Sequence, residues 1–148
     1  MKVRVGFLMY LLLTSMLIQA NDTIPQVIPE GRWEVVQVTV EKNTDDTVET
    51  NVYDKAEEVK SDILCPQEWE IKEAPQGVLL RYANGNEIFF DYAIEDSLLI
   101  ITIGSVTHSY RYEINGEELI LMAVFEQPGM NVENWTITLK RKKQINKN

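Results

Sequence analysis

The sequence predicts an all-β protein, a single antiparallel up-and-down meander of about eight strands closed into a barrel. Short runs rich in β-branched and aromatic residues follow one another at nearly even spacing, and Gly, Pro, Asn or Asp bounds each run. No run of comparable strength has the periodicity of a long helix. Closing such a meander removes its exposed edges, so residues 31–142 are expected to form one barrel domain.

The first 20 residues have the pattern of a secretory signal peptide and are not expected to belong to the barrel. Lys2 and Arg4 precede an apolar run, Val5 to Leu17, which ends before Ala20. A membrane anchor is the alternative, but the run is shorter than the roughly 18 residues expected of a spanning helix. We expect cleavage after Ala20 and export to the periplasm, the cell surface or the medium. The mature chain is expected to have no integral membrane segment, and residues 21–30 form an N-terminal segment before the barrel.

The first strand is expected at 32–42, directly after Gly31, and an acidic connection follows it. Residues 43–62 contain seven acidic side chains and few apolar ones. They are expected to hold an edge strand near 47–53 and a helical turn at 54–60, and to form a lid or binding loop. A calcium loop is the alternative, but the glycine turn and terminal Glu of such a site are missing.

The remaining strands follow in order, each delimited by turn residues. Asn84-Gly85-Asn86 is the strongest hairpin signal, Pro75-Gln76-Gly77 and Asn115-Gly116 mark two further turns, and residues 126–131 form a looser connection. The expected strands are 67–73, 78–83, 87–94, 97–103, 106–113, 117–125 and 134–141. Strands 97–103 and 117–125 are apolar on both faces, so the N-terminal segment, an undetected helix or a second subunit should cover an outer patch. Both a monomer and a homodimer fit this pattern.

Charge and composition argue against several functions. The chain has a formal net charge of −9, and its basic residues concentrate at the C-terminal end, where 143–148 form a basic tail. Such a body repels phosphate backbones, so no nucleic-acid partner is expected. Cys65 and His108 are the only residues of their kinds, which rules out a disulfide within the chain and an ordinary zinc site and gives little support to a catalytic dyad. We therefore expect no metal, no cofactor and no enzymatic activity.

Alternation along the strands predicts which side chains face the barrel interior. The inward set consists of apolar residues, tyrosines and the single histidine, which is the composition of a small-molecule pocket. A barrel of about eight strands can also be filled by its own side chains, so a ligand cavity and a filled core both remain open. The candidate ligand-binding residues are Val78, Leu80, Tyr82, Ile88, Phe90, Tyr92, His108, Tyr110 and Tyr112.

Gly31-x-Trp33 at the head of the first strand, the meander, and Arg141 in the last strand together resemble the lipocalin and calycin superfamily, in particular small bacterial lipocalin-like domains. The segments 65–71 and 90–98 are similar to those domains as well. The resemblance implies that Gly31, Trp33 and Arg141 close one end of the barrel, with the arginine packed on the indole. Two features depart from the family: a Thr-Asp-Tyr type of second motif and the paired cysteines of many animal members are both missing.

The resemblance implies a secreted lipocalin-like domain that binds a small hydrophobic or amphipathic ligand inside the barrel, with the 43–62 loop at its mouth. The alternative is a filled-core barrel that acts as a protein-interaction or inhibitor module in the cell envelope.

Overall fold

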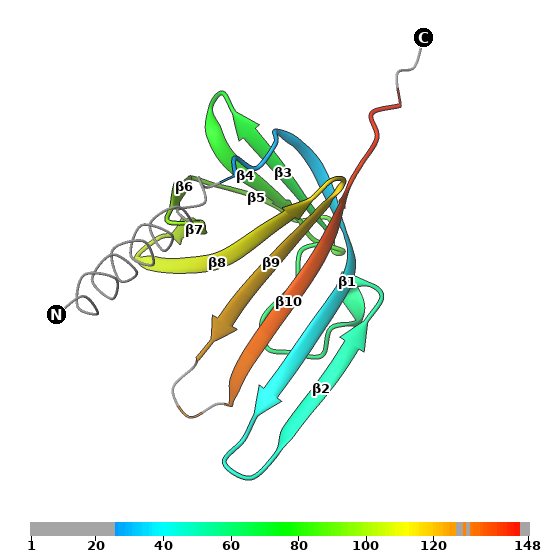
Figure 1. The fold of residues 1–148 in the computed structure, drawn as a ribbon, viewed down its shortest axis with the longest axis vertical. Helices are drawn as coiled ribbons and strands as arrows, with labels where there is room; N and C mark the ends of the chain where they lie inside the picture. The colour runs from blue at the N-terminus through cyan, green and yellow to red at the C-terminus, as the bar shows by residue number, and fades with distance from the viewer. Residues whose placement is uncertain (1–25, 127–128, 130, 146–148) are drawn as a thin grey trace, which may run out of the picture.

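The computed structural model describes residues 26–126, 129 and 131–145, so the predicted signal peptide lies outside the described residues. These residues form ten antiparallel strands and one 3₁₀ turn, η1 (Figure 1). The elements are β1 (Gly31–Asn43), β2 (Val48–Tyr53), η1 (Ala56–Glu58), β3 (Glu68–Glu73), β4 (Gln76–Arg81), β5 (Glu87–Phe90), β6 (Tyr92–Glu95), β7 (Leu98–Ile103), β8 (Val106–Asn115), β9 (Glu118–Phe125) and β10 (Val132–Arg141).

The strands form one nearly closed antiparallel barrel, which confirms the predicted fold class. Nine strands follow the order β5-β4-β3-β1-β10-β9-β8-β7-β6. The first strand therefore pairs with the last, as a closed meander requires. No backbone ladder joins β5 to β6 among the described residues, and this seam is the point where the barrel stays open. The path has nine strands where about eight were expected, because one predicted strand is divided into β5 and β6.

β1 is the longest strand and changes partner along its length. Its first residues pair with β3, from Gly31↔Ile71 to Glu34↔Glu68, and its last residues pair with β2, from Val38↔Tyr53 to Asn43↔Val48. An irregularity in the pairing with β10 lies between Val35 and Gln37, where the change occurs. A bulge bends its strand and re-aims it. The expected edge strand near 47–53 is therefore β2, which extends the sheet beyond the barrel wall (Figure 1).

The prediction of a single strand over 87–94 was wrong. The chain divides at Asp91, because β5 pairs with β4 through Phe90↔Val78 whereas β6 pairs with β7 through Tyr92↔Ile101. The two halves thus belong to opposite sides of the seam, a difference that residue alternation cannot show. The predicted helical turn at 54–60 is also shorter in the structure, where it is the three-residue η1.

Buried apolar side chains seal one end of the barrel. Trp33 is 0% exposed, and residues 26–30 cross this end with Ile28 buried. The Trp33 indole donates a hydrogen bond to the Pro29 carbonyl, and the Tyr112 hydroxyl donates one to the Gln26 carbonyl. The N-terminal segment therefore covers the closed end and is tied to it by two side chains from the wall.

At the opposite end, the mouth, residues 59–65 cross the inner face of the sheet. Ser61 donates a hydrogen bond to Glu133 on β10, and Lys42 on β1 donates one to the Lys60 carbonyl. Glu133 also accepts the indole N–H of Trp135 and lies 3.7 Å from the Lys42 ammonium. The second half of the acidic connection is thereby fastened to the wall, while Val59 and Ile63 pack against the core.

The apolar outer faces of β7 and β9 are partly covered by their neighbours. Leu98 and Met122 both lie opposite Arg111, and both are only partly exposed. Val124 is well exposed. Whether a second subunit covers this patch stays a prediction.

Candidate functional site

Gly31, Trp33 and Arg141 lie together at the closed end. Trp33 and Arg141 are directly opposed on β1 and β10, and the guanidinium carbon of Arg141 lies 5.9 Å from the centroid of the Trp33 ring. Arg141 also donates a hydrogen bond to the Glu30 carbonyl. Gly31 has a φ of +136°, where L side chains are rarely found. Each residue of the motif therefore has a structural role. Gly31 allows the positive φ at the first residue of β1, and Arg141 packs over the Trp33 indole.

Five aromatic rings form a continuous cluster inside the open half of the barrel. We refer to Trp69, His108, Tyr110, Phe125 and Trp135 as the aromatic cluster. Trp69 and Tyr110 make an edge-to-face contact at 5.3 Å between ring centroids, and Phe125 packs on Tyr110, His108 and Trp135 at 6.4, 5.9 and 5.4 Å. The rings come from β3, β8, β9 and β10, so the cluster spans the barrel from one wall to the other.

One polar atom of the cluster is buried without a partner. Trp69 is 1% exposed, and its indole N–H is the one buried side-chain nitrogen or oxygen among the described residues that makes no hydrogen bond. Leaving a buried donor unpaired costs about 1–3 kcal/mol. Burial raises the pKa of the neighbouring Tyr110 hydroxyl, and proximity to Tyr82 and Cys65 raises it further. The surroundings of the Tyr110 hydroxyl therefore disfavour negative charge.

The nine predicted ligand-binding residues divide into three groups by their positions. Val78, Leu80 and Tyr112 are buried, and Tyr112 belongs to the closed end through its bond to Gln26. Ile88, in the wall beside the seam, is 41% exposed. The other five are partly buried side chains, and of these Tyr82, Phe90, Tyr92 and Tyr110 pack against the core while His108 contacts Phe125.

The sequence reasoning omitted Trp69, Phe125 and Trp135 from the candidate residues. A signal was present for two of them, because Trp69 alternates with Ile71, and Trp135 with Ile137, on the apolar faces of their strands. Phe125 shares its parity with buried Leu121. Only the tertiary structure brings the three rings to Tyr110 and His108.

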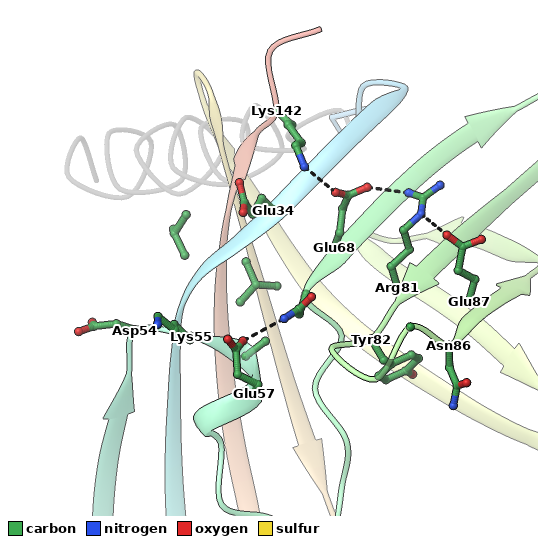
Figure 2. Close-up of a pocket in the computed structure, with 15 residues that line it drawn as sticks. Glu34, Asp54, Lys55, Glu57, Glu68, Arg81, Tyr82, Asn86, Glu87 and Lys142 are labelled. Carbon is green, nitrogen blue, oxygen red and sulfur yellow. Dashed lines mark hydrogen bonds and ion pairs between the residues drawn. The ribbon is translucent and has the colours of Figure 1, made fainter. Parts of the chain in front are cut away.

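A polar hollow of about 620 Å³ lies on the outer side of the β1 bulge, between η1 and the β4–β5 turn (Figure 2). At its edge Glu68 is buried, 7% exposed, and accepts hydrogen bonds from three cations. Arg32 and Arg81 each donate to one of its oxygens at 2.6 Å, and Lys142 donates to the other at 3.2 Å. Arg81 continues the network to Glu70 and Glu87.

The charges around Glu68 compensate one another. Burial acts to raise the pKa of Glu68, but the hydrogen bonds from Arg32 and Lys142 outweigh it and lower that pKa. Both carboxylate oxygens are occupied by cations, so Glu68 is poorly suited to act as a general base. The network joins β1, β3, β4 and the segment after β10, so its role is to stabilise the fold.

The described part of the structure has two further hollows. One, of about 640 Å³, lies where β8 and β9 diverge beyond the Arg111↔Met122 pair, and its lining includes His108, Phe125 and Trp135 of the aromatic cluster. The other, of about 970 Å³, lies beside the closed end and is lined by Arg32, Arg141, Lys142 and Lys143 together with acidic residues.

Within residues 26–126, 129 and 131–145, no group of three or more His, Cys, Asp or Glu side chains is placed to hold a metal ion. In the same part of the chain, no helix has the length and apolar character needed to cross a membrane.

The fold and its interior define the chain as an antiparallel, nearly closed β-barrel with one sealed end and an aromatic-lined open half. Comparison with protein-family models, curated proteins and solved structures found no match for this chain.

Proposed function

We propose that the protein is an exported lipocalin-like barrel that binds a small hydrophobic or amphipathic molecule in the open half of its interior. The observation that supports this most directly is the set of inward aromatic side chains, including Phe90, Tyr92 and Tyr110, that stay partly exposed although they pack against the core. An apolar wall with a few polar groups is the composition of small-molecule sites.

The two ends of the barrel suit this function in different ways. The closed end is sealed by Trp33, Arg141 and residues 26–30, so a ligand is expected to enter elsewhere. The mouth is crossed by residues 59–65, which are held by polar contacts to Glu133 and Lys42 and by the packing of Val59 and Ile63 against the core. Polar contacts near solvent contribute little stability and open at low cost. We propose that this segment moves aside when a ligand enters.

The test is binding of N-phenyl-1-naphthylamine, an uncharged fluorescent probe of apolar sites, to the purified protein. We expect saturable binding with a rise in probe fluorescence and quenching of tryptophan emission. Phe90→Ala removes an inward ring and should weaken binding severalfold. Phe89→Ala is the matched control, because this neighbouring ring lies on the opposite face, over Gly77, and should leave the affinity unchanged. Equal affinities in both variants, or no saturable binding, would show the proposal to be wrong.

A second candidate function, a protein-interaction module, is favoured by the free edge of β2. Among the described residues β2 pairs only with β1, and its Val48 and Val52 are 65% and 58% exposed. An exposed edge strand with apolar side chains is a template for strand addition by another chain. Sedimentation velocity over a range of concentrations tests the simplest case, a second copy of this chain. Association that Val48→Lys and Val52→Lys abolish would support it, and a strictly monomeric wild type would contradict it.

A further inference from the structure

The Trp69 indole N–H is a buried hydrogen-bond donor in the aromatic cluster of the barrel interior. Its ring contacts Tyr110 across the barrel, and the donor has no acceptor among the described residues. The two other tryptophans each use this atom, Trp33 toward the Pro29 carbonyl and Trp135 toward Glu133. The Tyr110 ring face can offer only a weak aromatic contact, which does not replace a full hydrogen bond.

A buried donor without an acceptor among the described residues can pair with an acceptor that a ligand brings. In a site built to hydrogen-bond its ligand, an analogue lacking the matching group leaves the protein group unpaired and is rejected. An ordered water could also pair with the indole N–H, but a stable buried water needs about two to four polar partners. The ring in contact with Trp69 is that of Tyr110.

The charge of the acceptor follows from the same surroundings. The side chains near Tyr110, which contacts Trp69, include Cys65, Tyr82 and Phe125, none of which carries a positive charge. Burial raises the pKa of the Cys65 thiol to about 12, so the interior disfavours an anion there. A ligand carboxylate would meet the same desolvation penalty without a cation to offset it.

We infer that the barrel selects an uncharged amphipathic molecule, and that the Trp69 N–H donates a hydrogen bond to a carbonyl, ester or ether oxygen at the buried end of that molecule. The inference rests on the proposed function. It adds the chemical class of the ligand and the residue, Trp69, that recognises it.

The experiment compares three probes of similar chain length by displacement of N-phenyl-1-naphthylamine from the full mature chain at pH 8. Methyl decanoate carries a neutral acceptor, decanoate a charged one, and decane none. We expect the ester to bind about tenfold more tightly than the alkane, the size of one hydrogen bond made in place of a buried unpaired donor. Decanoate should bind more weakly than its ester.

Two variants at position 69 assign the preference to the N–H. Trp69→Phe removes the donor, and replacement of Trp69 by benzothienylalanine removes it while keeping the volume of the ring system. Both changes should reduce the ratio of the ester and alkane affinities to about twofold or less, because the hydrogen bond to the ester is lost. The isosteric variant should keep the midpoint of urea unfolding of the wild type. Trp33→Phe is the matched control, since the Trp33 N–H is already bonded at the closed end, and it should keep the tenfold preference.

The outcomes separate this inference from the proposed function. If the three probes bind with equal affinity, if decanoate binds best, or if the ester preference survives both changes at Trp69, the inference is overturned and the proposed binding function stands. If neither the fluorescent probe nor any of the three ligands binds, the proposed function fails and the inference falls with it.

Discussion

Trp33 and Arg141 face each other across the β1–β10 pair, with the guanidinium carbon 5.9 Å from the indole centroid. The contact joins the beginning and the end of the barrel at the position where the sheet closes. Arg141 is exposed to solvent whereas Trp33 is buried. The arginine therefore works as a cover over a core residue, and the pair should contribute to stability rather than to ligand binding.

Removing the cover should have a modest effect on stability. Arg141→Ala is expected to lower the free energy of unfolding by about 1 kcal/mol, through loss of the cation–π contact and of the hydrogen bond to Glu30. Trp33→Ala should cost about 3–5 kcal/mol, as for other buried aromatic residues. Urea unfolding followed by circular dichroism measures both. Lys143→Ala is the control in the exposed tail, and a loss as large as that of Arg141→Ala would contradict a specific role of Arg141.

The buried Glu68 should make stability depend on acidic pH. Its pKa is lower in the folded state than in the unfolded state, so its contribution is present above the unfolded value of about 4.3 and is lost as the pH falls through the folded value. Glu68→Gln should therefore reduce the free energy of unfolding by about 1–3 kcal/mol at pH 7. At pH 3 the difference between variant and wild type should be smaller.

Urea titrations at both pH values measure this difference. Glu87→Gln is the matched control, because Glu87 shares the Arg81 contact but has a side chain that is 54% exposed, and it should change stability by less than about 1 kcal/mol. A Glu68→Gln effect that does not depend on pH would show that the carboxylate charge is not what matters.

Cys65 should be chemically inert while the protein is folded. Burial raises the pKa of its thiol to about 12, and the side chain is 8% exposed. The thiolate fraction at pH 8 should be about a thousandfold below that of an unfolded chain, where the pKa is about 8.5. Reaction with Ellman's reagent should be slow in buffer and fast in denaturing urea. The raised pKa also predicts that stability falls as the pH rises above the unfolded value. Rapid labelling of the folded protein would contradict both statements.

A glycine substitution in the β6–β7 turn should stabilise the folded protein. Asp96 and Ser97 have φ values of +47° and +66°, and they are the only described non-glycine residues with positive φ. A side-chain-bearing residue in this region costs roughly 1–2 kcal/mol relative to glycine. Ser97→Gly should therefore raise the free energy of unfolding by about 1 kcal/mol. In the β7–β8 turn, Gly104 already occupies the positive-φ position, so Ser105→Gly should bring no gain.

Glu133 should hold residues 59–65, the segment that crosses the mouth, against the barrel wall. Glu133→Ala removes the acceptor for Ser61 and Trp135 and the partner of Lys42. Amide hydrogen exchange followed by mass spectrometry should show faster exchange in residues 59–65, with unchanged exchange in β9 and β10. The exposed Glu34→Ala serves as the control. Unaltered exchange of 59–65 would mean that the packing of Val59 and Ile63 is sufficient to hold the segment.

The sequence predicts most of the fold because strand patterning and turn chemistry are local signals. The Asn84-Gly85-Asn86 and Asn115-Gly116 turns each connect two strands as expected, and the alternation of Trp135 with Ile137 reports a face that is buried in the structure. The division at Asp91 was missed because both halves carry strand-forming residues. Which neighbour each half pairs with depends on residues far away in the chain, on β4 and β7.

The candidate site was predictable only in part. Alternation places Tyr110 and His108 on the inward face, but it cannot show that Phe125 and Trp69 meet them, since those rings come from strands at other positions around the barrel. The Glu68 network was also missed, because a glutamate on the polar face of a strand gives no sign that two arginines and a lysine converge on it.

By itself, the sequence determined that this chain forms an antiparallel β meander, where most of its turns lie, and which faces of its strands are apolar, because backbone preferences and side-chain alternation act over a few residues. The tertiary structure decided where the barrel stays open, which charges compensate Glu68, and that the Trp69 N–H is buried without an acceptor. These features arise from distances between residues that are remote in sequence, and such distances exist only once the chain has closed on itself.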